Sequence, residues 1–279
     1  MAKKSIINHG LLLVLLFIGL FPLFYFSANK LGRAEAAQGE PVVVDSLDPI
    51  GRVIDNLAFG VGEKLEFEVK YGFISAGTAS MEVARLIDYQ GRPCYQIISL
   101  ANSNSFFSSV YNVEDRVESI VDATGLFPWR FDKRLREGSY RSDRQYDIDQ
   151  RNHTVVYKDS TFTVPSFVQD ALSTLYFVRT QPLEVGKSFY LDNFIDGKQY
   201  HLEARVLERE TVEVEAGSFD CFVVEPITQS VGLFKHEGKL KVWLTADRLR
   251  MPVLMKSKVI VGSIAVELTD YKLGSLEEF

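Results

Sequence analysis

The stretch VGEKLEFEVKYGFISAGTASMEV, from Val61 to Val83, constrains the fold most, because two alternating arms meet there across glycines. The apolar side chains of the first arm are Leu65, Phe67, Val69 and Tyr71, and the charged ones between them are Glu66, Glu68 and Lys70. A period of two is that of a half-buried strand. The second arm repeats the alternation after Gly72 and Gly77, so we predict a hairpin that opens an antiparallel sheet.

The rest of the chain continues this pattern, with alternating segments separated by short glycine-containing turns. Asp196-Gly197 is the strongest hairpin signal, between predicted strands at residues 187–195 and 198–208. Residues 154–163 are predicted as one strand, and 211–215 as a strand separate from 198–208. Because no βαβ rhythm occurs, we predict a mainly β fold: a large antiparallel, strongly curved sheet or half-open barrel of about a dozen strands.

One helix interrupts the predicted strands, in the segment PSFVQDALSTLYFVRTQP. Ser166 followed by Gln169 is a capping-box pattern for its start, and the helix must stop before Pro182. The apolar residues at helical spacing are Val168, Leu172, Leu175 and Tyr176. We expect this stripe to pack against the concave side of the sheet.

The N-terminus carries the features of an export signal. Lys3 and Lys4 precede an apolar run, Leu11 to Phe26, and Ala34-Glu35-Ala36 is a small-x-small cleavage pattern. The run is shorter than the roughly 20 residues of a spanning helix, although an uncleaved inner-membrane anchor stays open as the alternative. We predict a signal peptide or anchor over residues 1–36, a linker over 37–56 and a single antiparallel β domain over 57–279.

Composition narrows the class of protein. A hydrophobic content of 46% excludes a disordered chain, and a net charge of -6 gives no basic field to attract nucleic acid. The two cysteines, Cys94 and Cys221, lie in strand-like segments. In an oxidising compartment they form either a disulfide or two buried thiols, and the sequence leaves both open.

Four ordered segments resemble the bacterial domain-of-unknown-function 3108 family. They are the opening hairpin, QDALSTLYFVR, VEAGSFDCFVVEP and GKLKVWLTADRLRMPVLMKSKVIVGSIAVEL, which together span about Phe59 to about Leu268. The resemblance implies a periplasmic or envelope-facing protein with a large antiparallel sheet, similar to the half-open barrels of lipoprotein carriers. It implies no activity and no catalytic residue.

Motifs for catalysis, metals or cofactors are missing from the sequence. Beyond His9 in the signal, His153, His201 and His236 stand far apart without HExxH or cysteine spacing, so we predict no metal. GxSxG, GxxxxGK[ST] and GxGxxG are likewise absent, so we predict no cofactor and no catalytic residue, and an enzyme is the less favoured reading.

The segment WRFDKRLREGSYRSDRQYDID, from Trp129 to Asp149, carries the most unusual charge pattern. The candidate ligand-binding residues are Trp129, Arg130, Arg134, Arg136, Arg141 and Arg144. Guanidinium groups beside aromatic rings suit anionic headgroups, phosphates or sugar rings. The alternative is an exposed strand pair whose arginines pair with neighbouring aspartates.

The space between the helix and the sheet is the second candidate site. Residues predicted to line a cavity there are Phe131, Phe162, Leu172 and Tyr176. The alternative is a packed core, since protein interiors are normally close-packed.

From these observations we predict an exported, periplasmic, non-enzymatic binding or carrier module for an amphipathic or glycan-like ligand. A structural or assembly partner in the envelope is the alternative, ahead of a hydrolytic enzyme or an outer-membrane barrel. The expected partners are a lipid, a glycan or an envelope protein, with no nucleic acid, and with membrane contact only through the N-terminal segment if it is uncleaved.

Overall fold

The computed structural model describes residues 50–228, 240–258 and 262–275. In these ranges the strands form one 14-stranded sheet in the order β8-β7-β6-β5-β4-β3-β2-β1-β14-β13-β12-β11-β10-β9, with every neighbouring pair antiparallel. The predicted antiparallel, mainly β fold is confirmed. The predicted signal or anchor and His236 lie outside the described residues.

The elements follow the chain in a long meander with helices at two points. The strands of the first half are β1 (Lys64–Tyr71), β2 (Ile74–Tyr89), β3 (Arg92–Ser103), β4 (Glu114–Asp122), β5 (Pro128–Glu137), β6 (Tyr140–Asp149), β7 (Thr154–Tyr157) and β8 (Ser160–Thr163). Those of the second half are β9 (Ser188–Ile195), β10 (Lys198–Val214), β11 (Gly217–Thr228), β12 (Leu240–Thr245), β13 (Pro252–Lys258) and β14 (Ser263–Lys272). The helices of the described part are α2 (Ser105–Ser108) and α3 (Ala171–Thr180).

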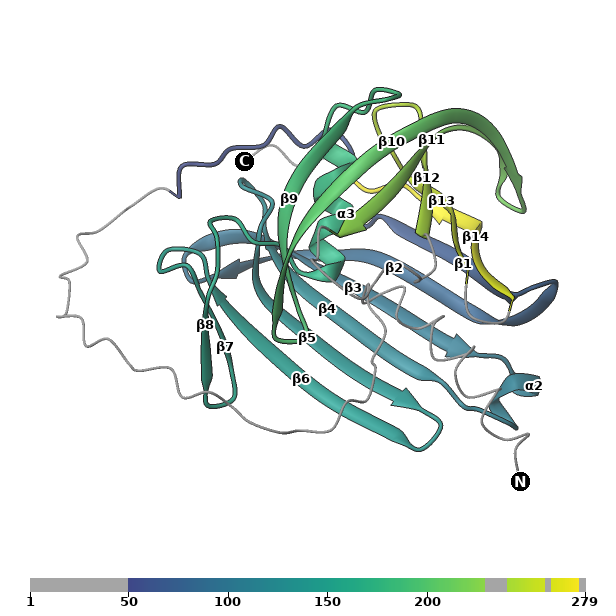
Figure 1. The fold of residues 1–279 in the computed structure, drawn as a ribbon, viewed down its shortest axis with the longest axis horizontal. Helices are drawn as coiled ribbons and strands as arrows, with labels where there is room; N and C mark the ends of the chain where they lie inside the picture. The colour runs from purple at the N-terminus through teal and green to yellow at the C-terminus, as the bar shows by residue number, and fades with distance from the viewer. Residues whose placement is uncertain (1–49, 229–239, 259–261, 276–279) are drawn as a thin grey trace, which may run out of the picture.

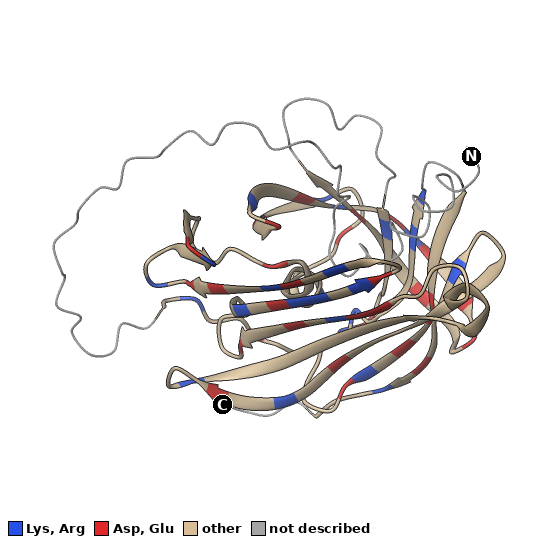
Figure 2. Ribbon diagram, turned by 90° about the horizontal axis from the view of Figure 1, so that it is seen from below, with Lys and Arg blue, Asp and Glu red and all other residues tan. Residues whose placement is uncertain are grey.

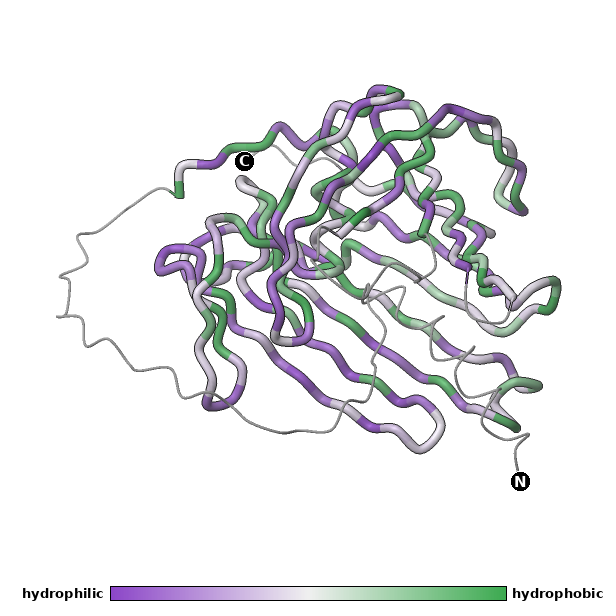
Figure 3. Tube along the Cα trace, in the orientation of Figure 1, coloured by the Kyte–Doolittle hydropathy of each residue, from purple (hydrophilic) through white to green (hydrophobic). Residues whose placement is uncertain are grey.

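The sheet curls around α3 (Figure 1), so one face becomes the interior and the other meets solvent. The period-two pattern decides which side chains face inward. Hydrophobic and hydrophilic residues alternate along the strands (Figure 3). On β1, Leu65, Phe67 and Val69 are buried, whereas the alternating charged residues and Tyr71 are partly exposed. Pairing of β1 with β14 joins the two ends of the described chain and makes the sheet continuous.

The sheet is not a closed barrel, because β8 and β9 are its two ends. Side chains nevertheless connect them: the rings of Phe162 and Phe194 lie 5.1 Å apart. Asp196, in the β9–β10 turn, forms ion pairs with Lys133 at 3.2 Å and Arg144 at 2.8 Å. The two ends therefore meet through side chains in place of ladder hydrogen bonds.

The observed helix starts later than predicted. Asp170, and not Ser166, is the N-cap of α3, and its capping-box partner is Ser173. Ser166 and Phe167 form a turn in which Phe167 has a φ of 60°, and Gln169 then forms a parallel bridge with Asn193 of β9. The predicted stop before Pro182 is confirmed, since α3 ends at Thr180.

Two predictions of where one strand ends and the next begins were wrong. The predicted strand at residues 154–163 is a hairpin of β7 and β8, with Lys158 at a φ of 53° in its turn. The predicted break between residues 208 and 211 is absent, because β10 continues through a bulge near Glu208.

The described part of the predicted linker contacts the domain. Arg52 donates to the carbonyl oxygens of Gly125 and Leu126 at 2.6 and 2.7 Å, and its guanidinium lies 4.3 Å from the ring centre of Phe167. Neither helix in the described ranges is long and apolar enough to cross a membrane.

Candidate ligand-binding cavity

Helix α3 is anchored at its N-terminus by the buried Asp170. This carboxylate accepts hydrogen bonds from the backbone N–H groups of Leu172 and Ser173 at 2.8 and 2.7 Å and from the Ser119 hydroxyl of β4 at 2.5 Å. Burial raises the pKa of Asp170 to about 6, although its hydrogen bonds oppose the rise. The cap therefore links the first turn of α3 directly to the sheet.

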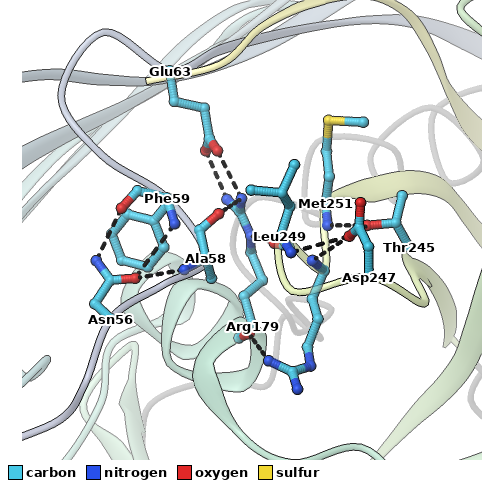
Figure 4. Close-up of polar contacts among 10 residues, drawn as sticks. Asn56, Ala58, Phe59, Glu63, Arg179, Thr245, Asp247, Leu249 and Met251 are labelled. Atoms are coloured by element: carbon cyan, nitrogen blue, oxygen red, sulfur yellow. Dashed lines mark hydrogen bonds and ion pairs between the residues drawn. The ribbon is translucent and has the colours of Figure 1, made fainter. Parts of the chain in front are cut away.

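The C-terminal end of α3 is anchored by the fully buried Arg179 (Figure 4). Its guanidinium donates to both carboxylate oxygens of Glu63 at 2.7 Å, a bidentate ion pair. It also donates to the carbonyl oxygens of Ala58 at 3.1 Å and Leu249 at 3.2 Å. One side chain thus joins the helix, the segment before β1 and the loop between β12 and β13.

An apolar cavity of about 90 Å³ lies between the anchored helix and the sheet. Helix α3 contributes Ala171, Leu172, Thr174, Leu175 and Val178 to its wall. The strand side chains of the wall belong to β1–β3 and β10–β14, including Phe67, Ala79, Ala101, Leu202, Val242 and Met255. Residues more than 100 positions apart in sequence therefore enclose one space.

The polar atoms of the cavity wall already have partners. The Ser99 hydroxyl donates to the carbonyl oxygen of Ser80 at 2.9 Å, and the Thr174 hydroxyl donates to that of Asp170 at 2.6 Å. Asn193 of β9 donates in turn to the Thr174 hydroxyl. Because these hydroxyls are already engaged, the cavity suits an apolar group.

The cavity contains one of the four side chains predicted to line it, Leu172. Phe131 packs against Tyr146, with ring centres 6.3 Å apart, and Phe162 packs against Phe194. Tyr176 packs edge-on against Phe59, with ring centres 4.8 Å apart. These three aromatic side chains pack in the core beside the cavity and are not part of its lining.

The Arg-rich hairpin is β5 and β6, and its arginines have hydrogen-bond or ion-pair partners within the protein. Trp129 is buried and donates to Asp122 at 3.2 Å. On the outer face Arg130 pairs with Asp132, whereas Arg134 and Arg136 both pair with Asp143. Arg144 points inward to Asp196, and Arg141 bonds only to carbonyl oxygens in the described part. Positively and negatively charged residues are interspersed along the strands of the sheet (Figure 2).

A hollow of about 580 Å³ lies over the outer face of β2–β6. Its lining includes Arg130 and Arg134 together with Tyr89, Ile87 and Ile120. The paired aspartates neutralise much of the positive charge there, so binding of an anionic or sugar ligand at this hairpin stays a prediction.

Two buried carboxyl groups on the inner face form a pair that sequence analysis missed. Asp115 of β4 and Glu137 of β5 are each 3% exposed. Burial raises the pKa of Asp115 to about 6, and burial together with the neighbouring Asp115 carboxylate raises that of Glu137 to about 8. The alternation of side chains along a strand could have revealed them, since Asp115 and Glu137 each occupy an inward-facing position of their strand.

Histidines and cysteines form no reactive cluster in the described ranges. His153 is exposed in the β6–β7 turn, and His201 contacts Asp192 at 3.0 Å on the surface of β9 and β10. No group of three or more metal-ligating side chains occurs in the part of the chain that the structure describes. Cys94 and Cys221 are buried free thiols in separate core clusters, so the possible disulfide is absent from this structure.

Comparison with known proteins places this geometry in a family. The model of the family described as "Protein of unknown function (DUF3108)" matches residues 66–269. A β-barrel-like protein of domain of unknown function DUF1849 from Brucella abortus is similar in fold, with a TM-score of 0.54, 9% identity, and coverage of 78% of this chain and 100% of that one. This likeness shows the fold alone. No curated protein matches.

Two further solved structures have lower TM-scores. One is described as a lipoprotein from Parabacteroides distasonis, with a TM-score of 0.36, 10% identity, and coverage of 79% of this chain and 99% of that one. The other is described as an exported protein with a YmcC-like fold from Bacteroides fragilis, with a TM-score of 0.30, 13% identity, and the same two coverages.

Proposed function

This chain belongs to the DUF3108 family, and from its cavity we propose that it is an exported, non-enzymatic binding or carrier module that takes the apolar part of an amphipathic ligand. The observation that carries the proposal is the apolar cavity of about 90 Å³ between α3 and the sheet. Export is supported by the N-terminal signal pattern in the sequence.

Preorganisation of the cavity supports binding. Asp170 and Arg179 anchor the two ends of α3, so contacts within the protein itself hold the helix above the sheet. A pocket that exists before binding avoids the cost of ordering its walls at the moment of association.

The volume limits what fits. A cavity of about 150 Å³ lined by aliphatic side chains holds benzene. The cavity under α3 is smaller, so it accommodates a short apolar group or the end of an acyl chain, while the polar part of the ligand remains outside.

The test compares two alanine-to-leucine variants. Ala101→Leu fills the cavity, whereas Ala123→Leu enlarges a buried alanine that does not line it. We expect Ala101→Leu to keep the melting temperature and to lose binding of fatty acids of increasing chain length. We expect Ala123→Leu to keep binding and to lose about 1–3 kcal/mol of stability through overpacking.

Ligand identity is read by mass spectrometry of organic extracts from protein purified without detergent. An apolar chain recovered from the wild type and lost from Ala101→Leu supports the proposal. Wild-type protein that neither carries nor takes up any fatty acid, or an Ala101→Leu variant that binds as well as the wild type, overturns it.

A further inference from the structure

Four apolar side chains project into solvent at one end of the sheet. Phe73 and Ile74, at the turn between β1 and β2, are 103% and 56% exposed. Phe106 of α2 and Val110 just after it are 69% and 66% exposed. We call these four residues the apolar rim.

Hydrogen bonds hold the two halves of the apolar rim together. The backbone N–H of Asn104, the N-cap of α2, donates to the carbonyl oxygen of Ala76 at 2.9 Å. Its side-chain amide donates to the carbonyl oxygen of Ser75 at 2.7 Å. Because Phe107 packs against the core, the neighbouring Phe106 is turned outward. The β1–β2 turn and α2 therefore form one surface.

An exposed arginine lies near the start of β6, next to the turn that contacts the segment after α2. The backbone N–H of Gly138, between β5 and β6, donates to the carbonyl oxygen of Asn112 at 2.7 Å, which joins this turn to the segment after α2. Arg141 follows it and is exposed, and its guanidinium donates to the carbonyl oxygens of Gly138 and Tyr140. It has no ion pair with a carboxylate in the described ranges, so its charge is available to an anion.

We propose that the apolar rim docks on the surface of a lipid bilayer that contains anionic lipids, with Arg141 at the headgroups. Solvent-exposed phenylalanines grouped at one end of a folded domain are typical of an interaction site, not of a monomer's ordinary surface. Aromatic and aliphatic side chains that reach the boundary of headgroups and acyl chains, next to a cation, match the chemistry of peripheral membrane binding.

The strands that carry the rim also line the cavity. Phe67 and Val69 of β1 and Ala101 of β3 lie on its wall, a few residues before the turn and α2 respectively. Docking by the rim would thus bring these strands to the membrane that supplies or receives an amphipathic ligand. Only this consequence for ligand transfer rests on the proposed function.

Site-specific fluorescence tests the docking. An environment-sensitive thiol probe is attached to Phe73→Cys and, separately, to Phe106→Cys in the full chain, where the native Cys94 and Cys221 are buried. The control position is Asn152→Cys, an exposed residue beyond the far end of β6. The protein is added to vesicles of phosphatidylcholine, with or without phosphatidylglycerol.

We expect a blue shift at positions 73 and 106 with phosphatidylglycerol vesicles, a smaller shift without that lipid, and no shift at position 152. Arg141→Glu should reduce the shift at position 73. The control position matters because the apolar N-terminal segment can hold the full chain at the vesicle by itself.

Three results would overturn the proposal. The first is a probe at 73 or 106 that stays as solvated as the one at 152. The second is an equal shift at all three positions. The third is a concentration-dependent shift at 73 without vesicles, which indicates a second copy of the chain on the rim. Failure of fatty-acid binding in the cavity would leave the docking inference intact.

Discussion

At the scale of single residues, the most consequential interaction is the buried ion pair between Arg179 and Glu63. Both side chains are almost completely buried, at 0% and 2% exposure, and the pair is bidentate. A buried charge that loses its partner retains the cost of desolvation without the compensating attraction. The pair is therefore a point where one substitution disturbs three segments of the fold.

We expect Glu63→Gln to destabilise the protein by about 3–5 kcal/mol, because it leaves the guanidinium of Arg179 uncompensated. Urea denaturation followed by circular dichroism measures the change. The double variant Glu63→Gln with Arg179→Met should recover part of the loss. Arg209→Met, which breaks the exposed pair with Asp220, is the control and should have little effect. An equal loss of stability in Glu63→Gln and in Arg209→Met would contradict the expectation.

The carboxyl pair of Asp115 and Glu137 makes stability depend on pH. Their folded-state pKa values, about 6 and about 8, lie above those of unfolded carboxyl groups, so the folded state binds more protons between about pH 4 and 8. The stabilising contribution is complete below the unfolded pKa and is lost as the pH rises through the folded values.

We expect the melting temperature of the wild type to fall between about pH 5 and pH 8.5. Glu137→Gln should flatten this fall, since an amide cannot be deprotonated beside Asp115. Part of the slope should persist, because Asp170 also has a raised pKa. Thermal melts across this pH range measure the effect. A Glu137→Gln profile as steep as that of the wild type would show that the pair does not cause it.

At the scale of elements, sequence analysis predicted the strands well and the start of the helix poorly. Alternation identified β1 to the residue, because each of its side chains either enters the core or meets solvent. Ser166 and Asp170 both carry capping side chains. The turn at Ser166 and Phe167 and the pairing of Gln169 with Asn193 of β9 place the start of the helix at the later cap. That partner lies beyond α3 in sequence, so local pattern could not distinguish the two caps.

The site shows the same division between local and long-range information. Leu172 was predicted from helical spacing and does line the cavity, whereas Phe131 and Phe162 belong to the aromatic core between the sheet's two ends. Their faces were predictable from alternation, but their neighbours depend on how far the sheet curls. A cavity depends on how side chains of distant strands pack together, so it could not be predicted from the composition of the chain.

Helix α3 depends on its cap more than an exposed helix would. We expect Asp170→Ala to cost about 2 kcal/mol or more, because it removes two backbone bonds and leaves the buried Ser119 hydroxyl without its acceptor. Asp170→Asn keeps an oxygen for the backbone bonds and should cost less. Chemical denaturation of both variants, with fatty-acid binding as a second readout, measures the effect. A cost for Asp170→Asn that matches that of Asp170→Ala would refute a capping role.

At the scale of the whole molecule, the sheet is a meander whose two ends approach without ladder pairing. The pairing of β1 with β14 joins the two halves of the sheet in the middle of the strand order, whereas its ends, β8 and β9, meet through side chains. Local hairpin signals predicted nearly every neighbouring pair, but not this long-range pairing. The curvature of the sheet therefore depends on side-chain contacts that connect its two ends. The most polar of these contacts are the ion pairs of Asp196 with Lys133 and Arg144.

Asp196 should accordingly control how tightly the ends are held. Asp196→Asn keeps the size of the side chain and tolerates the observed φ of 50°, but removes the charge that pairs with Arg144 and with Lys133, which is 4% exposed. We expect faster amide hydrogen exchange in β6–β9, with smaller changes in β1 and β14, measured by mass spectrometry. Asp192→Asn, which removes the carboxylate beside the exposed His201, is the matched control and should leave exchange in β6–β8 unchanged. Unchanged exchange in Asp196→Asn would mean that apolar contacts such as Phe162 with Phe194 hold the ends without the ion pairs.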